Sequence, residues 1–150
     1  MNGRHHVFVF DIDGTLSDCG HRVHHLRGDG PKNWDAFYAG MLDDAPIEHA
    51  VHLCQRLYPD VVFLTGRPEE YRDMTRDWIA QYIGHGATAH RLFMRSTGDY
   101  RDDAIVKLEL IASMRSEGYE VIMAFEDRKR VVEAYRANSI PCAQVAPGDF

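Results

Sequence analysis

Short, nearly continuous apolar segments recur along the chain, each bounded by small or charged residues. Four of them, at 6–12, 61–65, 91–94 and 120–125, have the pattern of buried strands, and 142–145 is a weaker fifth. Apolar runs of about four to eight residues bounded by turn residues are typical of strands covered on both faces, as in a parallel sheet. The pattern therefore predicts a central parallel sheet.

Helical spacing of apolar residues fills the intervals between these strands. Apolar positions recur every three or four residues within 71–82 and within 105–115, and a further helix at 129–137 would bury Val131, Val132 and Tyr135. Strands that alternate with helices of this length indicate βαβ units. We expect an α/β fold, a three-layer, Rossmann-like architecture with a central parallel sheet and helices on both faces.

Residues 18–46, directly after the first strand, break this alternation. The segment is rich in glycine, aspartate and histidine and holds one predicted helix, around 33–42. Trp34, Phe37 and Tyr38, together with Met41, fit the buried face of that helix, with stacking against nucleobases as the alternative. We therefore expect a small cap-like insertion, too short for a separate domain, within one domain that spans 1–150.

The composition is consistent with this fold class and limits the kinds of protein that the chain can be. Hydrophobic residues make up 45% and charged residues 27% of the 150 residues, which are ordinary globular values. No apolar run approaches the roughly 20 residues that span a membrane, so we expect a cytoplasmic protein that does not enter membranes. Cys19, Cys54 and Cys142 form no CxxC pair, which argues against a disulfide framework or a zinc site.

The net charge of −6 argues against a broad basic surface of the kind that binds nucleic acid without regard to sequence. Only three of the 17 basic residues are lysine, and arginine is the residue best suited to contact a phosphate through two hydrogen bonds. A coding bias explains the excess of arginine equally well. Charge alone therefore does not decide whether a polynucleotide is the substrate.

Acidic residues follow two strands at the edge where parallel sheets bind their ligands, outside the carboxyl ends. Asp11 and Asp13 end the first strand and are followed by Gly14, while Glu126 and Asp127 end the fourth. Facing carboxylates repel one another unless a hard divalent cation that prefers oxygen ligands, such as Mg²⁺, lies between them. A plain turn, in which aspartate and glycine are favoured, is the alternative.

A second group of residues is suited to hold a phosphate. Thr65, Gly66 and Arg67 follow the second strand and offer a hydroxyl, a backbone N–H and a guanidinium, with the start of a helix as the alternative. Lys107 stands four residues after Asp103 in a helical stretch, so the two share a face. Taken alone, such a pair is most often a solvated ion pair.

The order of these groups along the chain resembles the haloacid dehalogenase superfamily of phosphotransferases. Its four motifs match Asp11–Thr15, Thr65, Lys107 and Glu126-Asp127. A closer resemblance, over nearly all of the chain, is to the 3′-phosphatase domain of phage-type polynucleotide kinase-phosphatases. The segments that carry it are FDIDGTLSD with Arg22 eleven residues beyond Asp11, LTGRPEEYRDMTRDWI, LFMRSTGDYRDDAIVK and the closing EDRKRVVEAYRANSIPCAQVAPGDF.

The resemblance implies a role for each residue of the site. Asp11 is the expected nucleophile, and Asp13 is the expected general acid and base, with its backbone carbonyl on the metal. Mg²⁺ is the expected cofactor, with Asp11 and Asp127 as ligands and Glu126, which stands where the family usually has a second aspartate, as a further candidate. Arg22 is expected to reach the phosphate from the insertion. The other residues expected to hold the phosphate, or to orient the lysine that does, are Thr65, Gly66, Arg67, Lys107 and Asp103.

The resemblance further implies a Mg²⁺-dependent polynucleotide 3′-phosphatase that acts through an aspartyl-phosphate on RNA or DNA ends, with a kinase or ligase as partner in end repair. It leaves open the preferred nucleic acid, activity on 2′,3′-cyclic phosphates and the oligomeric state. No GxxxxGK[ST] motif occurs, so no 5′-kinase domain is expected. The alternatives are a phosphatase of small metabolites such as nucleotides or sugar phosphates, and a non-enzymatic receiver-like phosphoacceptor module.

Overall fold

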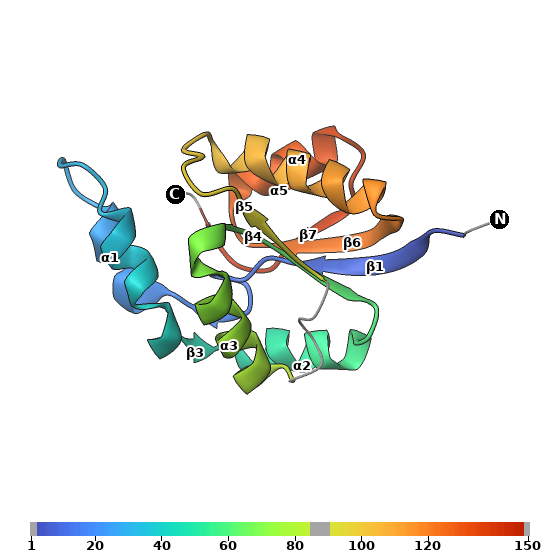
Figure 1. The fold of residues 1–150 in the computed structure, drawn as a ribbon, viewed down its shortest axis with the longest axis horizontal. Coiled ribbons are helices and arrows are strands. Elements are labelled where there is room, and N and C mark those ends of the chain that lie inside the picture. Colours follow the sequence, from blue (N-terminus) through green and yellow to red (C-terminus); the bar gives the residue numbers. More distant parts are fainter. Residues whose placement is uncertain (1–2, 85–90, 149–150) are drawn as a thin grey trace.

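Five parallel strands form the centre of the computed structural model, which describes residues 3–84 and 91–148 (Figure 1). Their order is β5–β4–β1–β6–β7, and each adjacent pair is parallel. The strands are β1 (His5–Phe10), β4 (Val61–Pro68), β5 (Leu92–Arg95), β6 (Tyr119–Glu126) and β7 (Cys142–Gln144). The predicted parallel sheet is confirmed, while residues 149 and 150 of the closing stretch lie outside the described residues.

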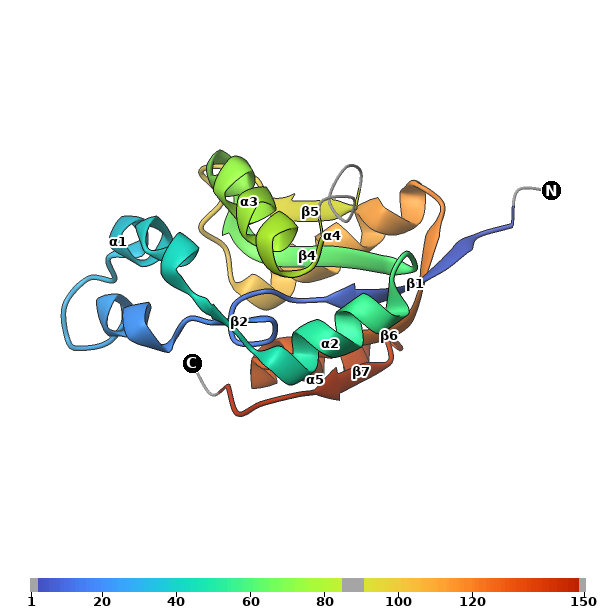
Figure 2. The same cartoon turned by 90° about the horizontal axis from the view of Figure 1, so that it is seen from below.

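Helices cover both faces of this sheet (Figures 1 and 2). They are α2 (Glu48–Leu57), α3 (Arg72–Tyr82), α4 (Asp103–Ser116) and α5 (Lys129–Ala137). Successive side chains of a strand point to opposite faces, so Val9 of β1 packs with α4 and α5, while Phe10 packs with α2 and α3. The three-layer α/β architecture is confirmed.

Strand β4 extends beyond its predicted end at Thr65, because its pairing with β5 continues to Pro68 after a shift of register. Gly66 and Arg67 therefore lie within an irregular strand. Reading this segment as the start of a helix is wrong, since α3 begins only at Arg72. A short 3₁₀ helix, η3 (Glu69–Tyr71), separates the two elements.

The insertion after β1 stands on a two-stranded antiparallel ribbon and lies at the carboxyl end of β1 (Figure 2). Its elements are β2 (Ser17–Asp18), η1 (Gly20–Leu26), α1 (Trp34–Ala39), η2 (Met41–Asp43) and β3 (Ala45–Pro46). The helix α1 is shorter than predicted. Asn33 caps its first turn by accepting a hydrogen bond from the Ala36 N–H at 3.1 Å, and the chain turns into a 3₁₀ helix after Gly40.

The insertion has an apolar cluster of its own. Phe37, Tyr38 and Met41 are buried in it together with Cys19, which confirms the predicted buried face of the helix. Trp34 packs against this cluster but is only partly buried. Trp34 therefore contacts the apolar cluster of the insertion and is also partly exposed to solvent.

Asp44, at the base of the insertion, is a buried carboxylate that ties several elements together. Its Oδ1 accepts from Arg22 Nε at 2.7 Å and lies 2.7 Å from the His21 ring nitrogen. Its backbone carbonyl accepts from Trp78 Nε1 of α3 at 2.9 Å. The insertion is therefore attached to α3 as well as to the end of β1.

Over residues 3–84 and 91–148, every helix is too short or too polar to cross a bilayer. Cys19, Cys54 and Cys142 are free, buried thiols, in agreement with the prediction that they form no disulfide framework.

The two faces of α4 provide a stability test. Ile111 is 1% exposed and packs against the sheet, whereas Ile105 is 50% exposed on the same helix. Ile111→Ala leaves a cavity in the core and should lower the free energy of unfolding by about 2–5 kcal/mol, while Ile105→Ala should change it by less than about 0.5 kcal/mol. Urea unfolding of both variants measures the difference, and equal effects would contradict this packing.

Candidate active site

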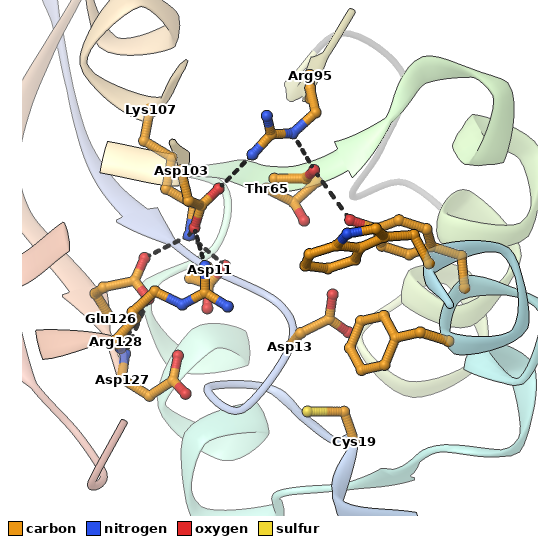
Figure 3. Close-up of a pocket in the computed structure, with 14 residues that line it drawn as sticks. Asp11, Asp13, Cys19, Thr65, Arg95, Asp103, Lys107, Glu126, Asp127 and Arg128 are labelled. Atoms are coloured by element: carbon orange, nitrogen blue, oxygen red, sulfur yellow. Dashed lines mark hydrogen bonds and ion pairs between the residues drawn. The ribbon is translucent and has the colours of Figure 1, made fainter. Parts of the chain in front are cut away.

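Polar side chains from several parts of the chain meet at the carboxyl edge of the sheet (Figure 3). Asp11 follows β1, Thr65 lies in β4, Glu126 ends β6 and Lys107 projects from α4. This edge is where open parallel sheets bind ligands, because the loops that leave the strands surround a crevice there. The prediction that these residues lie together is confirmed.

Lys107 pairs with three of the carboxylates in this cavity. Its Nζ lies 3.0 Å from Asp11 Oδ1, 2.7 Å from Glu126 Oε2 and 3.3 Å from Asp103 Oδ2. Burial alone would lower the pKa of Lys107, but these three carboxylates raise it well above its usual value. Lys107 and Asp103 share a face of α4 as predicted, but both are buried, so the reading as a solvated ion pair is wrong.

Three acidic side chains crowd one side of the cavity. Asp11, Glu126 and Asp127 each offer an oxygen, and these oxygens lie within 4.8 Å of one another. Burial, and then the charge of Glu126, raises the pKa of Asp11 to about 7. Burial also raises the pKa of Glu126 to about 7, although Lys107 opposes this shift. Burial and then Asp11 raise the pKa of Asp127 to about 7. Carboxylates that are buried this close together fit a site for a hard divalent cation.

The oxygens of Glu126 already have other partners. Oε2 accepts from Lys107, and Oε1 accepts from the backbone N–H groups of Asp127 and Arg128, at 3.1 Å each. Glu126 therefore fixes the lysine and the turn after β6 whether or not it also binds a metal. Its role as a ligand stays a prediction, as does that of Asp127.

Asp13 points away from this acidic group and toward two arginines. Arg67 donates to it through Nε at 3.0 Å and Nη2 at 2.6 Å, and Arg22 donates through Nη2 at 2.5 Å. Burial would raise the pKa of Asp13, but Arg67 and Arg22 together hold it well below its usual range. Any metal contact by Asp13 therefore rests on its backbone carbonyl and stays a prediction.

Arg22 and Arg67 lie behind Asp13, not in the cavity. Their side chains are 1% and 0% exposed, and neither lines the cavity wall. Arg22 also binds Asp44 and donates to the Phe37 carbonyl at 3.0 Å, which connects the insertion to the site. Both arginines position Asp13, and the direct phosphate contact expected of them stays a prediction.

Two glycines permit the close approach of carboxylates that line the cavity. A Cβ on Gly66 would lie 2.2 Å from Asp103 Oδ1, and one on Gly14 would lie 2.2 Å from Asp127 Oδ2. Gly14 also has a φ of +82°, which L side chains rarely adopt. The sequence suggested Gly66 as a phosphate ligand through its N–H; the structure adds that no larger residue fits beside Asp103.

Two arginines that the sequence did not single out also line the cavity. Arg95 donates to the Gly66 carbonyl at 2.8 Å and to Asp103 Oδ1 at 3.1 Å, and Arg128 donates to Asp103 Oδ2 at 3.3 Å. Burial would raise the pKa of Asp103, but Lys107, Arg128 and Arg95 lower it. Their positions just at or after the ends of β5 and β6 were the signal that could have found them.

The cavity thus brings together the Asp11 carboxylate, cations and a candidate metal site. An anion with a phosphoryl group would meet the lysine, the two arginines and the Thr65 hydroxyl, while the acidic group balances them. The lining residues are Asp11, Asp13, Cys19, Trp34, Phe37, Tyr38, Thr65, Gly66, Arg95, Asp103, Lys107, Glu126, Asp127 and Arg128.

The bracing of Asp13 can be tested through stability. Arg67→Met removes a buried cation and leaves a buried carboxylate with one partner fewer, which should cost about 3 kcal/mol in unfolding free energy. Arg56→Met, on the exposed surface of α2, is the matched control and should cost less than about 0.5 kcal/mol. Adding Asp13→Asn to Arg67→Met should recover part of the loss in urea unfolding; a loss no larger than that of the control would refute the bracing role.

The sequence of this chain is similar to those of known proteins. Residues 5–150 match the family described as the phosphatase domain of polynucleotide kinase PNKP. A protein of Autographa californica nuclear polyhedrosis virus, named a putative bifunctional polynucleotide kinase/RNA ligase, is 35% identical over 81 residues, which are 54% of this chain and 11% of the viral protein.

Solved structures agree with this match. A chain of the Pnkp1/Rnl/Hen1 RNA repair complex superimposes with a TM-score of 0.77 at 30% identity, over 98% of this chain and 44% of that one. The class C acid phosphatase of Bacillus anthracis shares the fold, with a TM-score of 0.61 at 14% identity over 97% of this chain and 69% of that one. This chain therefore spans less than half of the repair-complex chain and about a tenth of the viral protein. It belongs to the polynucleotide kinase PNKP phosphatase-domain family, a group of haloacid dehalogenase-type phosphomonoesterases.

Proposed function

We propose that this chain is a Mg²⁺-dependent polynucleotide 3′-phosphatase that removes the 3′-phosphate from RNA or DNA ends through an aspartyl-phosphate intermediate. The observation that carries the proposal is the placement of Asp11 beside Lys107 and next to Glu126 and Asp127, with Asp13 held nearby by two arginines. Membership of the polynucleotide kinase PNKP phosphatase-domain family supports a nucleic-acid end as the substrate.

The main physical obstacle to this reaction is charge. A phosphate monoester is an anion, and it must approach the carboxylate of Asp11. Lys107, Arg95 and Arg128 line the cavity and supply fixed positive charge, which is more effective in a buried site than in water. Asp103 binds all three of these cations and keeps them aimed at the cavity.

In the first step, a carboxylate oxygen of Asp11 forms a bond to phosphorus while the bond from phosphorus to the 3′ oxygen breaks. Asp13 gives that oxygen its proton, so the nucleic acid leaves with a 3′-hydroxyl. Arg22 and Arg67 favour the carboxylate form of Asp13 in the free protein. A bound phosphate adds negative charge next to Asp13 and raises its pKa, which favours protonation when it is needed.

In the second step, Asp13 takes a proton from a water molecule whose oxygen forms a bond to phosphorus. The bond between phosphorus and Asp11 breaks, which releases inorganic phosphate and restores the Asp11 carboxylate. The low pKa of Asp13 suits the stage at which it must be a carboxylate. Thr15 Oγ1 donates to Asp11 Oδ2 at 3.2 Å and Lys107 holds Oδ1, so the nucleophile keeps one orientation through both steps.

The residues present fit Mg²⁺, because three buried carboxylates with raised pKa values gather within reach of one ion. Asp11 and Asp127 would hold the ion, with the Asp13 carbonyl and Glu126 as further candidates. A bound ion would supply neutralising charge for the phosphoryl oxygens and remove the repulsion among the carboxylates.

The kind of partner follows from the relatives. The viral relative is named for kinase and ligase activities, and the structural relative comes from an RNA repair complex. We therefore place this chain in end repair, with a kinase or a ligase as the expected partner. Opening of 2′,3′-cyclic phosphates is an additional activity to test.

A substrate panel tests the proposed function. The protein with Mg²⁺ should release phosphate from a 3′-phosphorylated oligonucleotide with a kcat/KM at least about tenfold higher than from a 5′-phosphorylated one, a mononucleotide or a sugar phosphate. EDTA should abolish turnover, and Mg²⁺ should restore it. RNA and DNA versions of each oligonucleotide establish the preference, and a higher kcat/KM for a sugar phosphate would instead indicate a phosphatase of small metabolites.

The nucleophile is tested by Asp11→Asn, which keeps the shape but removes the attacking carboxylate. Turnover of the 3′-phosphorylated oligonucleotide should fall by at least about 10³-fold, while circular dichroism shows an unchanged fold. Asp60→Asn, at the opposite edge of the sheet before β4, is the matched control and should retain full activity. Mass spectrometry of the quenched wild-type reaction should show a phosphoryl adduct that Asp11→Asn lacks; an adduct on the variant would exclude Asp11 as the nucleophile.

A further inference from the structure

Two further hollows open beside the catalytic cavity, and Trp34 lines all three. The first, here the aromatic pocket, has walls formed by Trp34, Tyr38, Tyr71 and Tyr100. It shares Trp34, Tyr38 and Arg95 with the catalytic cavity, so a group attached to a phosphate in the cavity can extend into it. The second hollow shares Trp34, Tyr100 and Arg101 with the aromatic pocket.

The aromatic residues in its wall make the aromatic pocket a candidate stacking platform. Tyr38 packs on both neighbours, with ring centroids 5.8 Å from Trp34 and 5.0 Å from Tyr71. Tyr100 comes from the loop after β5 and is 89% exposed, and within the described residues its ring packs on no other aromatic ring. A flat aromatic ligand would gain contacts with rings that are already in place.

Acidic residues outnumber arginines in the wall of the aromatic pocket. Asp35, Glu70 and Asp99 line it together with Arg95 and Arg101, and Arg101 Nη2 lies 2.8 Å from Asp99 Oδ2. The carboxylates of Asp35 and Glu70 can accept hydrogen bonds, which suits the amino and ring N–H groups at the edges of nucleobases.

The second hollow has the opposite charge and is called here the basic groove. Arg27, Lys32, Arg101, Arg128 and Arg130 line it, and Asp102 is the single acidic residue among the described residues of its wall. Arg101 is paired with Asp99 and Glu109, and Arg130 with Asp102, so part of this positive charge is already balanced. Basic residues still outnumber acidic ones in this wall, although the protein has a net charge of −6. Phosphodiester groups are the nucleic-acid component that arginine and lysine contact most often.

The terminal nucleotide of a strand has three groups that lead away from its sugar: the 3′-phosphate, the base and the 5′-phosphodiester. The three hollows share Trp34 and offer a catalytic, an aromatic and a basic environment, one for each of these groups. We infer that the terminal base stacks in the aromatic pocket against Trp34 and Tyr100, while the strand leaves through the basic groove. This inference rests on the proposed function and adds the means by which the site recognises a polymer end.

The test uses a matched pair of 3′-phosphorylated oligonucleotides, one with a normal terminal base and one with an abasic terminal residue. Wild-type protein should show a KM about tenfold lower for the oligonucleotide with the base, since a stacked base is typically worth a factor of this order. Tyr100→Ala should remove most of that difference by raising the KM of the normal oligonucleotide alone. Tyr100→Phe, which keeps the ring, should behave as wild type, and Tyr58→Ala, beyond the end of α2, is the control for loss of a surface tyrosine.

The basic groove is tested with Arg27→Ala. It should raise the KM for a long 3′-phosphorylated oligonucleotide several-fold and weaken the dependence of KM on salt, but leave the KM for a nucleoside 3′-monophosphate unchanged. Arg56→Ala, on α2, removes an exposed arginine elsewhere and should change none of these.

The outcomes separate the two proposals. If wild-type protein turns over no oligonucleotide, the proposed function fails and this inference fails with it. If it turns over both oligonucleotides with equal KM, or if Tyr100→Ala and Arg27→Ala match their controls, the proposed function stands and the route of the strand is wrong.

Discussion

Repulsion among buried carboxylates at one edge of the sheet is the constraint on which the rest of the structure depends. Asp11, Asp13, Asp103, Glu126 and Asp127 are all at or near the carboxyl ends of the central strands, in a part of the protein from which water is largely excluded. Unpaired, such groups would cost several kcal/mol each. The structure gives Asp11, Asp13, Asp103 and Glu126 cationic partners, and these cations come from strands, helices and the insertion alike.

The cations fall into two sets that do different work. Lys107, Arg95 and Arg128 meet at Asp103 and face the cavity, so their charge is available to a ligand. Arg22 and Arg67 meet at Asp13 and are buried behind it, so their charge acts through that carboxylate. Two aspartates separated by one residue therefore have pKa values shifted in opposite directions. Burial raises the pKa of Asp11, while the arginines lower that of Asp13.

Much of this arrangement was predictable because it follows from topology. Alternation of strands and helices located the sheet, and the rule for its carboxyl edge brought Asp11, Thr65 and Asp127 together. The partners of charged side chains were less predictable, because they depend on where side chains lie in three dimensions, which residue spacing along the chain does not give. Arg67 and Arg95 are similarly placed in the sequence, but the irregular end of β4 buries Arg67 beside Asp13, whereas Arg95 lines the cavity.

The double attachment of the insertion has a consequence for how the site selects ligands. Asp44 is completely buried, is paired with Arg22 and is bonded through its carbonyl to Trp78 of α3. Swinging the insertion outward would expose or break that pair and separate Arg22 from Asp13. These contacts of Asp44 oppose an outward movement of the insertion, so we expect the opening above Asp11 to keep its dimensions when a ligand enters.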